Sequence, residues 1–557
     1  MADAKKMKKL TLIGALLCIF ALPFLVRNGK RAISANADDT VIVLTGHNEN
    51  LRFEFGQGFQ KWYKERTGRS VFVDWRYLGG VSEIVRYLDS VYASAFRQHW
   101  ETELGRQWTA DVQRAFVRRT ADRDKWTDEL QRDVCEAFYN SSISSSIDIF
   151  FGGGVSEFII QADLGTIVDS GFLREHPELF CESCIPHYIG SEELWDGHGR
   201  WFGQSLSSFG ILRNRAAMAE RCLVDGDAIQ WEQLADPRMF GILSLVDPTK
   251  SSALLKAYEV IIQQQIFFRL KELEQEFGRP ADGEMRKMAA EDGWLRGLRL
   301  LQRMAGNTRY FSDAPSKMVQ DVASGNSAVG IIVDFMGNGQ AAFDNGRCGW
   351  ERLNFTMPAN GSTISPDPIA ILRGAPNENV AKLFLEYILG EGGQKIIAFK
   401  VGTPGGPIRN ELYRPPVHRA IYGDEYIAYR SNRENQFDDL VSSSLAADAA
   451  DTARLYNALK WIVKFALMVP QRELVDAWGA IVKARREGRT ENADMAMAIF
   501  ENFSGFTYGE ANETLSAILH QSQPSAALEA QRNIVERFQR QYKQAKLVAE
   551  SCSKRCR

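Results

Sequence analysis

The sequence has almost no net charge. Its 67 lysine and arginine residues nearly balance its 70 aspartate and glutamate residues, so the formal net charge is −3 over 557 residues. A balance of this kind produces no overall electric field that would draw the protein to a polyanion or to an anionic membrane surface. We therefore expect no nucleic-acid partner.

The sequence also lacks the short motifs of common enzyme classes. It contains no G-x-S-x-G elbow, no complete P-loop and no H-E-x-x-H zinc signature. Carboxylates are abundant, but no spacing singles out a pair for acid–base catalysis. These absences favour a protein that binds a molecule, with no catalytic residues and no cofactor. A secreted hydrolase is the less favoured alternative.

Cysteine is scarce, with eight residues in the chain. Cys181 and Cys184 form a C-x-x-C pair, and Cys552 and Cys556 lie close together near the C-terminus. In an oxidising compartment each pair would close a small loop, and we interpret C-x-x-C as a structural disulfide rather than a redox site. A zinc site would need a second pair nearby, which His187 alone does not supply, so no metal is predicted.

One long hydrophobic run stands at the N-terminus. Four lysines between residues 5 and 9 precede the apolar stretch Leu10 to Val26, and Ala35-Asn36-Ala37 follows as a candidate cleavage site. This order is typical of an export signal. The run also reaches the lower limit of about 17 residues for a membrane span, so an uncleaved anchor in the inner membrane is the alternative. Residues 1–37 are predicted as a signal peptide or signal anchor, and the remainder as periplasmic or otherwise extracytoplasmic.

Short apolar runs alternate with helical periodicities through most of the chain. Strands are predicted at 41–44, 71–75, 147–151, 201–212, 242–246 and 328–333. Alternation of strand and helix predicts an α/β protein with a parallel sheet. Residues 94–140 interrupt this rhythm as a charged helical insert, and Phe96, Trp100, Leu104 and Trp108 suggest one packed face.

The segment Ser365–Gln394 is the most informative stretch. Pro368 to Leu372 is typical of a buried strand, and Gly374 breaks it. Asn377 stands where a helix N-cap belongs, and apolar residues then recur at helical spacing until the glycines that begin at Gly390. The pattern predicts strand, turn and helix.

Five blocks of the sequence occur in an order that resembles a known family. They are 45–50, 148–154, 202–211, 247–252 and 325–337, the last followed by 363–385. The chain from Asp39 to Asn410 resembles family 1 extracellular solute-binding proteins of ABC importers, in the branch that includes ferric-ion and sugar-phosphate binders. The resemblance implies a two-lobed periplasmic-binding-protein type II fold that captures a small molecule and delivers it to an ABC permease.

The resemblance also implies a division of the chain. Lobe 1 is expected at 38–205 and 355–422, with the helical insert inside its first part, and lobe 2 at 206–354. Residues 423–557 are predicted as an all-helical C-terminal extension packed on lobe 1. Its amphipathic helices leave partner docking open as an alternative.

The predicted ligand site lies where strands end. In an open α/β sheet, ligands bind outside the carboxyl ends of the strands, and a hydroxyl-rich helix N-terminus favours an anion such as phosphate or carboxylate. Lys250 would add positive charge. The predicted ligand-binding residues are His47, Asn48, Glu49, Gly153, Gly154, Ser207, Ser208, Thr249, Ser251, Ser252 and Asp334.

Each of these residues also has an ordinary structural interpretation. Loop residues such as His47 are often simply exposed, the glycines permit a tight turn, and Thr249 or Ser251 would serve as a plain helix cap. The crossover serines would satisfy a buried strand, and Asp334 would cap the next turn. Asp367, between two prolines, is interpreted as a structural turn residue at the hinge.

One departure from the family pattern bears on the ligand. The ferric-ion binders hold iron with adjacent tyrosines near the end of a second-lobe strand, where this chain has Asp334-Phe335. We therefore rank a small organic or phosphorylated anion, such as a sugar phosphate or phosphonate, above ferric iron. A membrane-anchored ligand-sensing receptor is the main alternative to transport.

Overall fold

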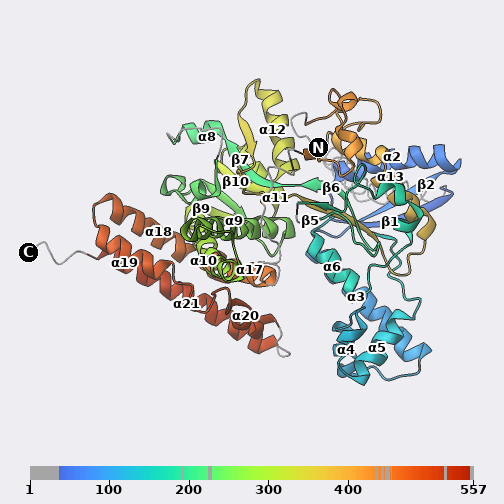
Figure 1. The fold of residues 1–557 in the computed structure, drawn as a ribbon, viewed down its shortest axis with the longest axis horizontal. Helices are drawn as coiled ribbons and strands as arrows, with labels where there is room; N and C mark the ends of the chain where they lie inside the picture. The colour runs from blue at the N-terminus through green and yellow to red at the C-terminus, as the bar shows by residue number, and fades with distance from the viewer. Residues whose placement is uncertain are drawn as a thin grey trace, which may run out of the picture.

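The computed structural model describes residues 37–551, except 191, 222, 224–228, 433–436, 439, 441–444, 446–451, 453–454 and 520–523. Two α/β lobes lie side by side, with a helical appendage on each (Figure 1). The two-lobed architecture expected from the resemblance is confirmed. The predicted export segment, apart from Ala37, and the Cys552–Cys556 pair lie outside the described residues.

Lobe 1 is built on one mixed sheet, whose described strands run in the order β2-β1-β3-β12-β6. The first three are parallel, but β12 runs antiparallel to both its neighbours, so the expectation of a parallel sheet is wrong for the part of the sheet where the chain returns from lobe 2. The strands are β1 Asp39–Thr45, β2 Val71–Tyr77, β3 Ile149–Phe151, β6 Phe202–Ser207 and β12 Ser365–Ile371. One face packs against α2 Glu49–Thr67, α13 Glu378–Leu389 and α14 Glu391–Ala398, and the other against α3 Val81–Gln98 and α6 Val155–Asp163.

The predicted strand–turn–helix of Ser365–Gln394 is present as β12 and α13. Asn377 occupies the N-cap position, but its side chain does not cap the helix. Its backbone N–H and Nδ2 instead donate to the carboxylate of Asp148, at 2.6 and 3.0 Å. Because Asp148 directly precedes β3, this pairing joins the start of β3 to the start of α13.

The insert forms helices, as expected. α3 runs into a π-helical turn, His99–Glu103, followed by α4 Ala110–Val117 and α5 Glu129–Tyr139. Phe96 stacks on Phe116 with ring centroids 4.8 Å apart, inside the core that the insert shares with lobe 1. The expectation is wrong for Leu104, which is exposed because the helix ends at that residue, just before Gly105 turns the chain.

Lobe 2 has a second mixed sheet, with its described strands in the order β11-β7-β10-β8-β9. The strands are β7 Phe209–Asn214, β8 Leu243–Val246, β9 Thr308–Ser312, β10 Val329–Val333 and β11 Leu353–Thr356. Its main helices are α9 Ser252–Phe277, α10 Gly283–Asn307, α11 Pro315–Ala323 and α12 Asp334–Cys348. The chain crosses between the lobes from β6 to β7 and again from β11 to β12.

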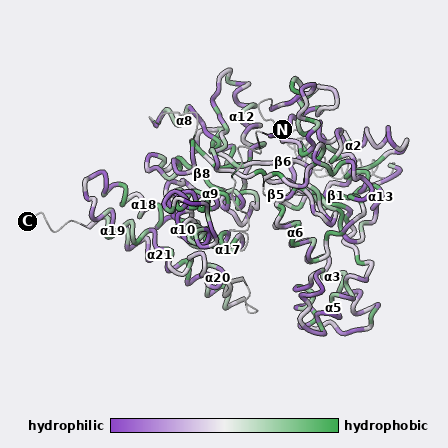
Figure 2. The backbone as a smooth tube through the Cα atoms, viewed as in Figure 1, coloured by the Kyte–Doolittle hydropathy of each residue, from purple (hydrophilic) through white to green (hydrophobic). Residues whose placement is uncertain are grey.

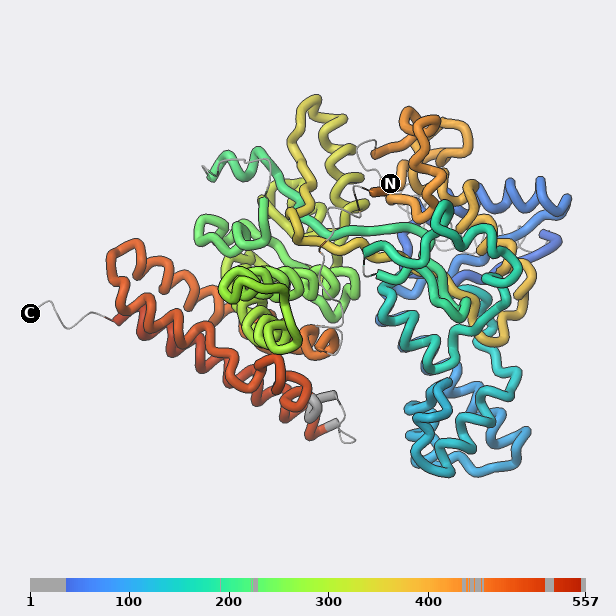
Figure 3. Tube along the Cα trace, in the orientation of Figure 1, coloured from blue at the N-terminus to red at the C-terminus, as the bar shows by residue number. Residues whose placement is uncertain are grey.

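The C-terminal helices pack on lobe 2, so the expectation that they pack on lobe 1 is wrong (Figure 3). Trp478 Nε1 donates to Asn307 Oδ1 at 2.7 Å, and Trp294 Nε1 donates to the Phe506 carbonyl at 2.9 Å. Gly306 in α10 leaves the space that the Trp478 ring fills. The helices are α17 Tyr456–Ile462, the π turn Val463–Met468, α18 Gln471–Arg486, α19 Thr490–Phe500, α20 Ala511–Leu519 and α21 Pro524–Glu550.

The helices of this C-terminal unit are amphipathic. Figure 2 shows hydrophilic and hydrophobic residues in turn along them, as expected for helices with one buried and one solvated face. Across residues 37–551, as far as they are described, no helix combines the length and apolarity that a membrane span needs.

The C-x-x-C pair does not form the predicted disulfide in this structure. Cys181 and Cys184 lie in one tight turn, with the Cys184 N–H donating to the Cys181 carbonyl at 3.0 Å, and both are free thiols. Among the described residues, no group of three or more His, Cys, Asp or Glu side chains is placed to hold a metal ion.

Candidate functional site

A cavity of about 550 Å³ lies between the two lobes, at the carboxyl ends of their strands. Lobe 1 lines it with the loops after β1, β2 and β3, and lobe 2 with the loops after β8, β9 and β10. This is the position that the topology of open α/β sheets assigns to a ligand.

Six of the eleven predicted ligand-binding residues line this cavity. They are His47, Asn48, Gly153, Ser207, Ser251 and Ser252. Lys250 also lines it, and its side chain is exposed. Residues from both lobes therefore line one space, although His47 and Ser252 are 205 positions apart in the sequence.

The other five predicted residues lie outside the lining and serve local structure. Glu49 is exposed in the first turn of α2, and Gly154 is the N-cap of α6. Thr249 Oγ1 donates to Asp247 Oδ1 at 2.7 Å. Ser208 Oγ donates to Asp334 Oδ2 at 3.2 Å, so these last two residues satisfy one another at the crossover between the lobes.

A buried charged cluster on the lobe 1 wall was not predicted. Arg414 Nη1 donates to Asp367 Oδ2 at 2.5 Å, and both side chains are at most 10% exposed. Asp367 Oδ1 accepts from the Gly153 N–H at 2.9 Å, and His47 Nε2 lies 3.5 Å from Asp367 Oδ2. Asp367, interpreted from the sequence as a turn residue, instead lies in β12 and lines the cavity.

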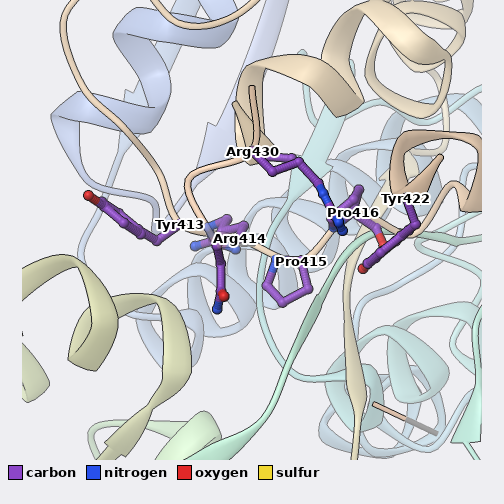
Figure 4. A pocket seen from close by; sticks show the side chains of 8 residues that line it. Tyr413, Arg414, Pro415, Pro416, Tyr422 and Arg430 are labelled. Carbon is purple, nitrogen blue, oxygen red and sulfur yellow. The ribbon is translucent and has the colours of Figure 1, made fainter. Parts of the chain in front are cut away.

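Arg414 reaches from lobe 1 toward lobe 2. Its guanidinium lies over the ring of Phe335 at the start of α12, 3.8 Å from the ring centroid. Figure 4 shows Arg414 between Tyr413 and Pro415, at a small pocket that Tyr422 and Arg430 also line. An arginine followed directly by two prolines was the sequence signal that could have marked this position.

The electrostatics of the cluster follow from burial and pairing. Burial lowers the pKa of His47 to about 4, although Asp367 opposes the shift, so the imidazole is neutral at neutral pH. Burial would raise the pKa of Asp367, but the charge of Arg414 and the hydrogen bond from the Gly153 N–H hold it below its usual range. The cluster therefore holds an ionised Arg414–Asp367 pair beside a neutral histidine.

The lobe 2 wall is organised differently, around the start of α9. Ser251 is the N-cap, and its Oγ accepts from the Leu254 N–H at 3.4 Å. The preceding turn, Asp247 to Lys250, closes with the Lys250 N–H donating to the Asp247 carbonyl at 3.0 Å. The turn places Lys250 in the cavity lining next to Ser251 and Ser252.

Within the described part of the chain, five helices begin at the cavity. α2, α3, α9, α11 and α12 each contribute their N-cap residue to its lining. The N-cap residues of α3, α11 and α12 make no side-chain cap, but at α12 the Phe335 N–H donates to the Asp334 carboxylate at 2.8 Å. First-turn N–H groups lack partners inside their own helix, and the helix dipole places partial positive charge there. Their convergence makes the cavity suited to an anion.

The connection between the lobes is a hydrogen-bonded joint. Besides the Ser208–Asp334 contact, the Asp334 N–H donates to the Ser208 carbonyl at 2.9 Å, and the Phe209 N–H donates to Ser362 Oγ at 2.8 Å. Burial raises the pKa of Asp334 to about 7, against hydrogen bonds from the Phe335 N–H and from Ser208.

A second cavity of about 630 Å³ adjoins the first. It lies between α11 and α12 of lobe 2 and the segment 409–414 of lobe 1. The residues that line both cavities are Asn48, Ser316, Phe335, Met336 and Arg414. The space between the lobes therefore extends beyond the first cavity, which the five helix N-termini line.

A family model described as a bacterial extracellular solute-binding protein matches residues 143–421. Among curated proteins, the chain is 25% identical over 250 residues to the phosphoglycerate transport regulatory protein PgtC of Salmonella typhimurium. The match covers 43% of this chain and 54% of that protein, so the chain spans about half the length of the curated relatives it matches.

Solved structures with a similar fold include two binding proteins. The periplasmic binding protein AfuA from Actinobacillus pleuropneumoniae, with fructose-6-phosphate bound, is 13% identical, with a TM-score of 0.44, over 76% of this chain and 98% of AfuA. The apo ferric ion-binding protein A of Pasteurella haemolytica is 14% identical, with a TM-score of 0.43, over 76% of this chain and 96% of its own.

Proposed function

Because the chain belongs to the family of bacterial extracellular solute-binding proteins, we propose that it captures a small anionic ligand between its lobes and delivers it to an ABC import permease. The observation that carries this proposal is the convergence of five helix N-termini on one interlobe cavity, whose charged lining residues are Lys250, the Arg414–Asp367 pair, Glu83 and Asp313. Backbone N–H groups at helix N-termini bind anions without needing a dedicated cationic pocket.

We infer that the ligand is a small phosphorylated organic acid or sugar. The curated relative is named for phosphoglycerate transport, which supports a phosphorylated ligand. The cavity offers a hydrogen-bonding surface of serine hydroxyls, amides and N–H groups to such a molecule. Phe335 lines the cavity in the region where the resemblance to ferric-ion binders implies tyrosine, and it offers iron no phenolate oxygen.

The mechanism we propose is hinge closure. Ligand binding stabilises the closed state because both walls contact the ligand only when the lobes approach one another. The crossover at Ser208 and Asp334 is the proposed hinge. The N-terminal pattern of lysines and apolar residues supports export to the periplasm, and the permease would then recognise the closed form.

A ligand-sensing receptor is the second candidate. Two observations favour it: the curated relative is called a regulatory protein, and the C-terminal helical unit lies beyond the region that the family model matches. In this case the closed state would be recognised by a signalling partner instead of a permease, with the same ligand chemistry.

Thermal unfolding with a ligand panel tests the proposal. Residues 38–557 are purified and mixed with 3-phosphoglycerate, fructose 6-phosphate, a phosphonate, inorganic phosphate, unphosphorylated glycerate or ferric citrate. A phosphorylated ligand at about 100 times its Kd should add about 2.7 kcal/mol to the free energy of unfolding, and glycerate much less. Stabilisation by ferric citrate alone, or by no compound in the panel, would contradict the proposal.

A further inference from the structure

The loop that presents Lys250 to the cavity is held from behind by the C-terminal unit. Lys464, in the π-helical turn Val463–Met468, donates from Nζ to Asp247 Oδ2 at 2.7 Å. The Asp247 side chain is 4% exposed. A segment outside the family-matched region therefore reaches a residue only three positions before a cavity-lining lysine.

The Asp247 carboxylate organises this loop through its other oxygen. Oδ1 accepts from the Thr249 N–H at 2.9 Å and from Thr249 Oγ1 at 2.7 Å. The backbone of Asp247 is tied to β9, because its N–H donates to the Ser312 carbonyl at 2.8 Å. One carboxylate thus connects the C-terminal unit, through Lys464, to the turn that places Lys250 and Ser251 in the cavity lining.

A second contact links the same two regions five residues after Asp247, at Ser252. Tyr456, at the start of α17, donates its hydroxyl to the Ser252 carbonyl at 3.2 Å. Ser252 is the first residue of α9 and lines the cavity. The two contacts fix both ends of the segment from Asp247 to Ser252.

The surroundings of Lys464 explain why this pairing is specific. The residues before and after it are buried and apolar, among them Ile462, Val463, Phe465, Ala466 and Leu467. Burial alone would raise the pKa of Asp247, but the hydrogen bonds from Lys464 and Thr249 lower it, so the carboxylate stays ionised. Removing one partner of such a pair leaves the other charge buried without compensation.

We propose that Lys464 is a positioning residue for the ligand loop, and that the C-terminal unit sets ligand affinity by holding Asp247 and Ser252 in place. The inference rests on the proposed function, because it concerns the same interlobe site. It also predicts that a partner bound to the C-terminal unit would change affinity without touching the ligand.

The test compares Lys464→Met with Lys464→Arg and with a matched control, Lys546→Met. Lys546 belongs to the same unit and pairs with Asp476 at 3.0 Å, away from the ligand loop. Calorimetric titration uses the panel compound that stabilises the wild-type protein most. We expect Lys464→Met to weaken binding about tenfold, which corresponds to about 1.4 kcal/mol, while Lys464→Arg restores most of it and Lys546→Met changes nothing.

Two further measurements separate this role from general destabilisation. Because Lys464 acts through the loop, the losses from Lys464→Met and Lys250→Ala should be less than additive. Hydrogen exchange, which needs no ligand, should show faster exchange at residues 249–253 in Lys464→Met but not in Lys546→Met.

The outcomes distinguish the two proposals. If the wild-type protein binds a panel compound and Lys464→Met binds it equally well, the positioning role is wrong and the proposed function stands. If the wild-type protein binds no compound, the proposed function is wrong. Unchanged exchange at residues 249–253 in Lys464→Met would overturn the positioning role in either case.

Discussion

The two walls of the cavity handle charge in opposite ways. Lobe 1 presents a buried cluster in which Arg414 and Asp367 are already paired beside a neutral His47. Lobe 2 presents an exposed lysine, Lys250, on a loop whose shape depends on Lys464 of the C-terminal unit. The lobe 1 wall is therefore held by contacts within lobe 1 itself, whereas the lobe 2 wall is held by a contact from the C-terminal unit. We therefore expect substitutions in the lobe 1 wall to change mainly the stability of the fold. Substitutions in the lobe 2 wall should change mainly the affinity for the ligand.

The largest expected effect is at the buried pair of lobe 1. Arg414→Met leaves the Asp367 carboxylate buried without its cation, so we expect a loss of roughly 3–5 kcal/mol in the free energy of unfolding. Urea denaturation measures it. The double variant Arg414→Met/Asp367→Asn should lose much less, because no uncompensated charge remains. Equal losses in the single and double variants would show that packing over Phe335, rather than charge, dominates.

The hinge should give a smaller, pH-dependent effect. Asp334 has a pKa of about 7 in the folded protein, above its ordinary 3.8. The folded state then binds more protons than the unfolded state, so the contribution of Asp334 is fully present below about pH 4 and is lost as pH rises through about 7.

Asp334→Asn removes this loss. Its stability advantage over the wild-type protein should grow between pH 5 and pH 8 by roughly 2 kcal/mol. The opposite pH dependence of His47 is common to both proteins and cancels in the comparison. Denaturation curves at the two pH values measure the difference, and an advantage that does not change with pH would mean that Asp334 titrates normally.

The smallest expected effect on stability is at Lys250. Because its side chain is exposed, Lys250→Ala should change the free energy of unfolding by less than about 0.5 kcal/mol. Affinity for a phosphorylated ligand should nevertheless fall about tenfold, by about 1.4 kcal/mol. Titration calorimetry and thermal unfolding of the same samples test both parts. A stability loss without an affinity loss would show that Lys250, like Thr249, serves the local structure and does not contact the ligand.

Local patterns predicted most of the fold. The periodicity of Ser365–Gln394 was sufficient for β12 and α13, because strand and helix each follow from residues close in sequence. The docking of the C-terminal helices was not predictable in this way. Their apolar faces fit either lobe by composition, and the choice depends on the space that Gly306 leaves for Trp478.

The site was predictable only in part, for a similar reason. Loops after strands lead to the cavity, which placed His47, Gly153 and Ser251 correctly in its lining. Whether a polar side chain faces the ligand or a neighbour depends on its partners. Thr249 donates a hydrogen bond to Asp247, and Arg414 donates one to Asp367, 47 positions earlier in the sequence. Neither partner is evident from the neighbouring sequence.

The most direct test of the account is the change of shape on ligand binding. Small-angle X-ray scattering of the wild-type protein should show a smaller radius of gyration when the panel compound that stabilises it most is added at saturation, because the lobes close over the ligand. Glycerate at the same concentration should leave the radius unchanged. Tight binding of a phosphorylated compound with no change in the radius of gyration would contradict closure between the two lobes.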